Sequence, residues 1–260
     1  MAAQNRWTRE QLLIAFYLYC RMPFGKMHSR NPEIIRYANL IGRTPSALAM
    51  KLTNIASLDP AIINSGRSGL PGASAADRAM WDEMNADWDA FSLDSHRAIE
   101  LLDSSGDVQK ELEREIEEAS SGIYEGTNRV VTTTARIGQN LFRKSVLSAY
   151  NNRCCISGLS HPKFLIASHI VPWRDDPKNR LNPSNGLCLS VLHDKAFDQG
   201  LLAIDGDMTV VVSSQLKQAP DTFLKESLLA FEGRSIDLPE KFAPDEAFLS
   251  HHYHNVFMPE

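Results

Sequence analysis

Three residues of the types used in hydrolytic chemistry follow one another within a short stretch of the chain: His169, Asn185 and His193. A neutral imidazole with an ordinary pKa near 6.5 can take a proton from water at cellular pH. A second histidine can bind a divalent ion that polarises a phosphate, and an asparagine amide can hold a loop. In this order, these residue types fit a metal-assisted phosphodiesterase.

The residues around these positions indicate the elements that must carry them. Residues 165–171 have strand character and deliver His169, and a turn with a polar, basic loop follows over residues 172–184. Residues 185–189 predict a returning strand, and residues 193–197 predict a short helix. The expected unit is therefore a β-hairpin followed by a helix, with an ion held between strand and helix.

The motifs in this part of the chain resemble those of the HNH endonucleases, which have the ββα-metal fold. The closest likeness is to the restriction-type branch of that family. The motifs occur in the order R-x-x-Q-x-x-F-R, C-x-x-[S/T]-G, H-I-x-P-W, N-G-L and H-x-x-x-F-D-x-G-L. The resemblance covers residues 130–260, roughly half of the chain, and implies a metal-dependent DNA endonuclease. By association with the family, it also points to bacterial restriction or phage defence.

The resemblance implies a role for each matching residue. His169 would be the general base, Asn185 would hold the hairpin loop and so orient His169, and His193 would bind the metal ion. Asp198 would complete the metal ligands, or would instead cap a turn. Mg²⁺ is the abundant ion, and an oxygen-rich site also accepts Mn²⁺. The candidate phosphate contacts in this half of the chain are Arg136, Arg143 and Arg174.

One position departs from the family pattern. Many HNH enzymes carry an acidic residue or a histidine directly before the base, as a further metal ligand, whereas this chain has Ser168. A serine hydroxyl is a poor ligand for a hard cation. Either Asp198 or water would therefore have to complete the coordination sphere.

The N-terminal part predicts three helices. The first begins after the capping-box pair Thr8 and Gln11, and the next two begin at Asn31-Pro32 and Thr44-Pro45, where a cap residue precedes a proline. Gly42 ends the second helix, so the second and third form a helix-turn-helix pattern. If the third helix enters the major groove of DNA, its candidate contacts are Arg43, Ser46, Lys51 and Asn54. A purely structural helical module remains the alternative for this part.

Charge and composition divide the chain further. Residues 1–60 carry 8 Lys+Arg against 3 Asp+Glu, and residues 136–200 carry 9 against 4, although the whole chain has a net charge of −5. The two basic segments are those assigned to DNA. We expect a helical domain at 1–100, an acidic helical connector at 101–127 and a nuclease domain at 128–260.

The sequence therefore predicts an α+β protein, with a helical helix-turn-helix domain and a C-terminal ββα-metal nuclease domain. The expected substrate is double-stranded DNA, and cutting both strands would need a homodimer or two successive nicks. One alternative is a DNA-binding regulator with an inactive HNH-like domain, and another is an RNA-directed nuclease or toxin. The chain has no membrane-length apolar run and no signal-peptide core, so the expected location is the cytoplasm.

Overall fold

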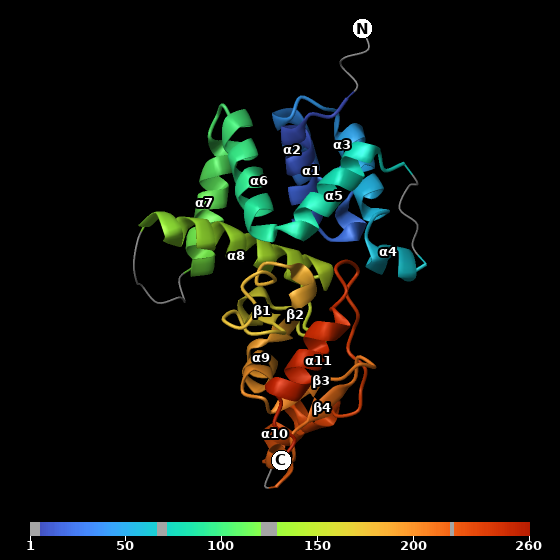
Figure 1. The fold of residues 1–260 in the computed structure, drawn as a ribbon, viewed down its shortest axis with the longest axis vertical. Helices are drawn as coiled ribbons and strands as arrows, with labels where there is room; N and C mark the ends of the chain where they lie inside the picture. Colours follow the sequence, from blue (N-terminus) through green and yellow to red (C-terminus); the bar gives the residue numbers. More distant parts are fainter. Residues whose placement is uncertain (1–5, 67–71, 121–128, 219–220) are drawn as a thin grey trace. The chain divides into compact units, whose positions relative to one another are not determined.

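The computed structural model describes residues 6–66, 72–120, 129–218 and 221–260. The chain divides into two compact units, Met1–Ser145 and Val146–Glu260. The division falls inside helix α8 (Arg129–Ala149), later in the chain than the predicted start of the nuclease domain at residue 128 (Figure 1). Helix α7 (Asp107–Ser120), predicted as a connector, belongs to the first unit.

Helix α1 (Arg9–Arg21) forms the centre of the first unit. The predicted capping box is present, since Thr8 and Gln11 exchange hydrogen bonds at its N-terminus. All nine residues from Leu12 to Cys20 are buried. The reason is the nearly continuous apolar run of this segment, because a helix that is hydrophobic all round is buried on all sides.

Helices α2 (Pro32–Leu40) and α3 (Pro45–Ala56) begin at the predicted caps. Asn31 accepts a hydrogen bond from the Glu33 amide, and Thr44 accepts one from the Ala47 amide. Gly42 has φ +64°, the left-handed conformation that glycine adopts most readily at a helix C-terminus. The two helices pack against each other, and α3 also packs against α1. Two capped helices joined by a short turn are therefore present, and their assignment as a DNA-binding helix-turn-helix stays a prediction.

The remaining helices of this unit are α4 (Pro60–Asn64), α5 (Ala75–Ala86) and α6 (Trp88–Leu102), followed by α7 and the first part of α8. Asp87 is extended and separates α5 from α6. Its side chain accepts a hydrogen bond from the Ala90 amide, so Asp87 acts as the N-cap of α6 and starts a new helix.

The second unit contains the predicted hairpin and helix. Strands β1 (Leu165–His169) and β2 (Gly186–Ser190) are antiparallel, with Leu165 opposite Ser190 and His169 opposite Gly186. Helix α9 (Val191–Asp198) follows β2 without a break and contacts both strands (Figure 1). The turn after α8 is tied to the hairpin, because the Cys155 amide donates to the Cys188 carbonyl over 2.8 Å.

A second hairpin and further helices complete this unit. Strands β3 (Leu202–Ile204) and β4 (Val210–Val212) pair as an antiparallel hairpin, and helices α10 (Thr222–Ser227) and α11 (Glu246–Asn255) follow. Gly200 has φ +69°, and a Cβ there would lie 2.2 Å from the Val256 carbonyl oxygen. Only glycine therefore allows the C-terminal segment to lie against the end of α9.

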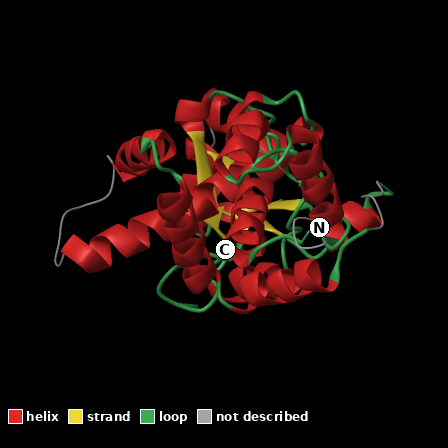
Figure 2. Ribbon diagram, turned by 90° about the horizontal axis from the view of Figure 1, so that it is seen from above, coloured by secondary structure: helices red, strands yellow, loops and turns green. Residues whose placement is uncertain are grey.

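The described residues are mostly helical, with two two-stranded sheets in the second unit (Figure 2). The predicted mixed fold is confirmed in this coarse form. In the described parts of the chain, no helix combines the length and the apolar character needed to cross a membrane.

Candidate active site

His169 lies at the end of β1, as predicted, and is held from two sides. Its Nε2 lies 2.8 Å from the Arg180 carbonyl oxygen, and its ring packs edge-on against Trp173 at 5.4 Å between centroids. A carbonyl only accepts hydrogen bonds, so Nε2 carries the proton in the neutral ring and the lone pair lies on Nδ1. Burial lowers the pKa of His169, although the bond to Arg180 raises it in part. The imidazole is therefore neutral near pH 7, as a general base requires.

Asn185 closes the loop between the two strands. Its Oδ1 accepts a hydrogen bond from the Val171 amide over 2.8 Å, and its Nδ2 donates to the Val171 and Asn179 carbonyls, each over 3.3 Å. Its own carbonyl accepts a hydrogen bond from the Ile170 amide, and the side chain is fully buried. These hydrogen bonds hold the backbone directly after His169 in place. They are consistent with the orienting role predicted for Asn185, which stays a prediction.

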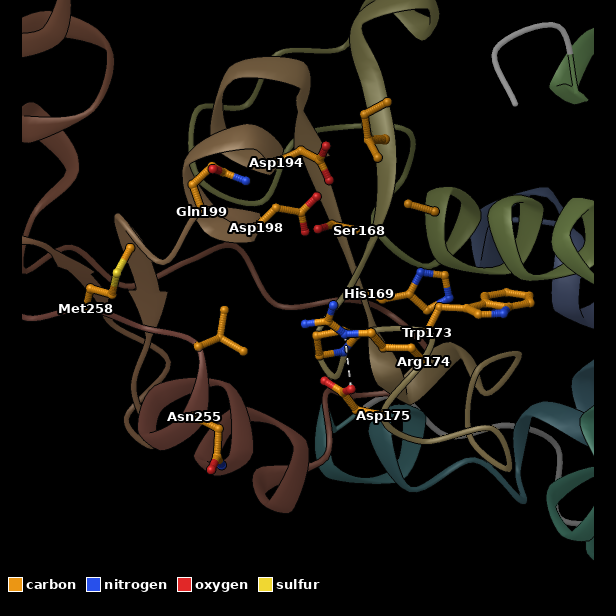
Figure 3. Close-up of a pocket in the computed structure, with 14 residues that line it drawn as sticks. Ser168, His169, Trp173, Arg174, Asp175, Asp194, Asp198, Gln199, Asn255 and Met258 are labelled. Atoms are coloured by element: carbon orange, nitrogen blue, oxygen red, sulfur yellow. Dashed lines mark ion pairs between the residues drawn. The ribbon is translucent and has the colours of Figure 1, made fainter. Parts of the chain in front are cut away.

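A polar cleft of about 720 Å³ opens beside β1 in the second unit. Its lining includes His169, which packs against Trp173 on one side, and the acidic residues of α9 on the other (Figure 3). Arg174 also lines the cleft, with 87% of its side chain exposed and an ion pair to Asp175 at 3.3 Å. The predicted phosphate contact Arg174 thus lies beside the predicted base.

Asp194 and Asp198 lie one helical turn apart on α9 and line the same cleft. Figure 3 shows the Ser168 side chain pointing toward both carboxylates, whereas His169, the next residue of the strand, points away from them. This alternation is the ordinary pleat of a β-strand. The sequence analysis named Asp198 as a candidate ligand but missed Asp194. The i, i+4 spacing of two acidic residues beside the motif histidine was the signal that could have identified it.

The two carboxylates shape the local electrostatics. Burial raises the pKa of Asp194 to about 6; the Ser168 hydroxyl lowers it and the charge of Asp198 raises it further. The pKa of Asp198 is also raised by burial. The Ser168 Oγ is buried and, although close enough to affect Asp194, makes no hydrogen bond of ordinary geometry. Two crowded carboxylates and an unsatisfied hydroxyl form an oxygen-rich set of the kind that suits a hard divalent cation.

His193 lies elsewhere. It is 3% exposed, faces the core together with Ala196 and Phe197, and does not line the cleft. Its Nδ1 lies 2.7 Å from the Ser190 Oγ and 3.7 Å from the Cys154 Sγ. The structure therefore places His169 and Asp198 in one cleft, and Asn185 in the loop that follows His169. His193 does not line this cleft. Neighbouring helical residues point about 100° apart, which separates His193 from Asp194. Among the described residues, no group of three or more His, Cys, Asp or Glu side chains is placed to hold a metal.

The candidate DNA contacts in the first unit differ in their exposure. Lys51 is buried and donates to both carboxylate oxygens of Asp77, so the structure contradicts its predicted contact with DNA. The Arg43 guanidinium stacks on the Trp7 ring at 5.0 Å and donates to the Arg6 carbonyl. Ser46 is exposed and Asn54 is half-buried.

Arg136 and Arg143 lie on α8, in the part of the helix that belongs to the first unit, and both are half-buried. Their predicted contacts with phosphate stay predictions.

Comparison with known families identifies the region that contains the cleft. Residues 154–205 match the family model described as HNH endonuclease. The matched segment includes β1, β2, α9 and β3, and it supports assignment of this part of the chain to the HNH family. No curated protein matches the chain. The family match indicates a nuclease, which is a hydrolase with a nucleic-acid substrate.

Proposed function

We propose that this protein is a metal-dependent DNA endonuclease that hydrolyses phosphodiester bonds with His169 as the general base. The observation that carries the proposal is the position of a neutral, tautomer-fixed imidazole in the same cleft as two adjacent carboxylates. The Arg180 carbonyl, the Trp173 ring and the loop closed by Asn185 hold the imidazole. The Nδ1 lone pair of His169 would accept the proton of the attacking water.

Asp194 and Asp198, with the Ser168 hydroxyl, would hold the divalent ion in place of the predicted His193. Hard oxygen ligands fit Mg²⁺ or Mn²⁺. When bound, such an ion polarises the scissile phosphate and stabilises charge on the leaving oxygen. Arg174, at the rim of the cleft, would contact a flanking phosphate.

The choice of DNA over RNA, and a role in restriction or phage defence, rest on the likeness to the family. Cleavage of labelled duplex DNA, single-stranded DNA and RNA of one sequence, in Mg²⁺, Mn²⁺ and EDTA, tests the substrate class. We expect metal-dependent cleavage of duplex DNA. Cleavage of RNA alone would favour the RNA-directed nuclease.

The alternative of a DNA-binding regulator with an inactive nuclease fold is tested by a gel-shift series with DNA across salt concentrations. Binding to DNA without cleavage in either metal would favour this alternative. Cleavage that is lost in EDTA would exclude it.

A further inference from the structure

A small cluster of polar side chains lies in the core of the second unit, on the buried side of α9, and does not line the cleft. It consists of Cys154, Ser190 and His193, which are 0%, 7% and 3% exposed. The His193 Nδ1 lies 2.7 Å from the Ser190 Oγ and 3.7 Å from the Cys154 Sγ. Hydrogen bonds from His193, from Ser157 and from the backbone lower the pKa of Cys154 to about 6, against the effect of its burial. The cluster is therefore a connected set of interactions.

This cluster lies at the point where β2 becomes α9. Ser190 is the N-cap of α9, and its Oγ accepts a hydrogen bond from the His193 amide over 3.3 Å. Both the backbone amide and the ring Nδ1 of His193 therefore contact the Ser190 hydroxyl. The ring also packs edge-on against Phe231, at 5.3 Å between centroids. The contacts with Ser190, Cys154 and Phe231 together fix the direction in which the His193 side chain points.

The direction of His193 determines the direction of the next residue. On an α-helix, consecutive side chains are rotated by about 100°, so a ring anchored in the core turns Asp194 toward the cleft. Asp198 lies one turn further on the same face. A rotation of α9 about its axis would move both carboxylates away from Ser168.

We propose that His193 is a positioning residue, which holds α9 so that Asp194 and Asp198 share one metal ion with Ser168. This inference rests on the proposed function, because it assigns His193 a task in the same metal site. Residues that orient metal ligands affect metal affinity by about 10- to 100-fold when they are replaced.

A ligand role for His193 itself conflicts with its surroundings. The Nδ1 is engaged by Ser190, and the residue is 3% exposed, with its ring packed edge-on against Phe231. His193 does not line the cleft that contains the carboxylates. The two roles make opposite predictions for amide substitutions, because an asparagine amide mimics Nδ1 of histidine and a glutamine amide mimics Nε2.

The test measures Mn²⁺ binding to the full chain by calorimetry, for the wild type, His193→Ala, His193→Asn and His193→Gln. Val210→Ala is the control, since Val210 is buried in β4 of the same unit and pairs with Ile204 rather than with α9. We expect Mn²⁺ affinity to fall about tenfold or more in His193→Ala. His193→Asn should retain more affinity than His193→Gln, and Val210→Ala should bind Mn²⁺ as the wild type does at a temperature where all variants are folded.

Wild-type affinity in His193→Ala would overturn the inference, and so would stronger binding by His193→Gln than by His193→Asn. If His193→Ala does not fold, the comparison of the two amide variants decides. Failure of the proposed function gives a different pattern, in which the wild type binds no Mn²⁺ or Asp194→Asn binds it as the wild type does.

Discussion

At the scale of single residues, the candidate active site depends on which side chains of β1 and α9 face the cleft. Apolar runs and turn residues predicted a strand that ends near His169, as observed. The loop-holding role of Asn185 was implied by the resemblance to the HNH endonucleases. The proposed metal ligands were harder to predict, since His193 and Asp194 are neighbours in sequence and only Asp194 lines the cleft. Their separation depends on the packing of α9, where His193, Ala196 and Phe197 form the buried face. A motif names a position, but only packing tells which of two adjacent residues faces the cleft.

Replacing Asp194 should show whether the carboxylate pair holds the ion. Asp194→Asn removes one charge from a partly buried pair and keeps the side-chain volume. We expect weaker Mn²⁺ binding and a loss of cleavage that higher Mn²⁺ concentrations partly restore. Calorimetry and cleavage rates over a Mn²⁺ series measure both effects.

The control for this change is Asp175→Asn, which alters a carboxylate that lines the same cleft but pairs with Arg174. It should leave Mn²⁺ affinity within about twofold of the wild type, because surface ion pairs contribute little. Equal losses in both variants would argue for a general effect of charge rather than for a site at Asp194.

At the scale of elements, a helix start could be predicted where a clear capping residue stands in the sequence. The starts of α1, α2 and α3 follow from Thr8, Asn31 and Thr44. The break at Asp87 could not be predicted, because an aspartate within a run of helical apolar periodicity fits equally well on the exposed face of one continuous helix. The burial of Lys51 was also missed, because its partner Asp77 lies on a different helix.

Lys51 should matter for stability rather than for DNA binding. Its ammonium lies 2.8 Å from Asp77, which is itself fully buried. Lys51→Ala leaves that carboxylate without its partner, a change that typically costs about 3–5 kcal/mol. Urea unfolding measures the loss, and Ser46→Ala on the exposed side of α3 serves as the control. Unchanged stability in Lys51→Ala, with weaker DNA binding, would restore the predicted contact.

Helix α11 should make the second unit sensitive to acid through His252. The ring stacks on Phe197 at 3.6 Å, and its Nε2 lies 3.1 Å from the Phe197 carbonyl, to which it donates. Burial lowers the pKa of His252 to about 4, from an ordinary value of 6.5. Between these values the unfolded chain binds a proton that the folded chain does not, so the contribution to stability falls as the pH drops from 6.5 toward 4.

The slope from this one group is at most about 1.4 kcal/mol per pH unit. His252→Phe keeps a stacking ring and removes the titration, so its free energy of unfolding should fall less than that of the wild type between pH 7 and pH 5. Urea unfolding at both pH values measures this difference. Parallel losses in the two proteins would show that other groups cause the acid sensitivity.

At the scale of the whole molecule, a sum of charges over residues 1–60 overstates how many of its basic side chains are free of acidic partners. Several basic side chains of residues 1–60 form ion pairs with acidic residues of the helices that follow. The pairs are Arg9–Glu83, Arg21–Glu115, Arg36–Glu111 and Lys51–Asp77. A sum of charges along the sequence does not include such pairing. Acidic residues of the same helical unit therefore neutralise much of the excess positive charge of residues 1–60.

Arg174 differs from those residues because 87% of its side chain is exposed. Arg174→Ala should weaken binding to different DNA sequences about equally and reduce the slope of log affinity against log salt by about 0.9, the value for one phosphate contact. Fluorescence anisotropy in EDTA across a salt series measures the slope without cleavage. Ser46→Ala should leave the slope unchanged; a larger effect there than at Arg174 would place the main DNA contacts on α3.

The most direct test of the account is nicking of supercoiled plasmid by the wild type and by His169→Ala, in Mg²⁺, Mn²⁺ and EDTA. We expect open-circular or linear product with the wild type in metal and none in EDTA. In His169→Ala the rate should fall by about 10²- to 10⁴-fold, the usual contribution of a general base, while Mn²⁺ binding persists. Cleavage by His169→Ala at the wild-type rate, or cleavage by the wild type in EDTA, would contradict the account.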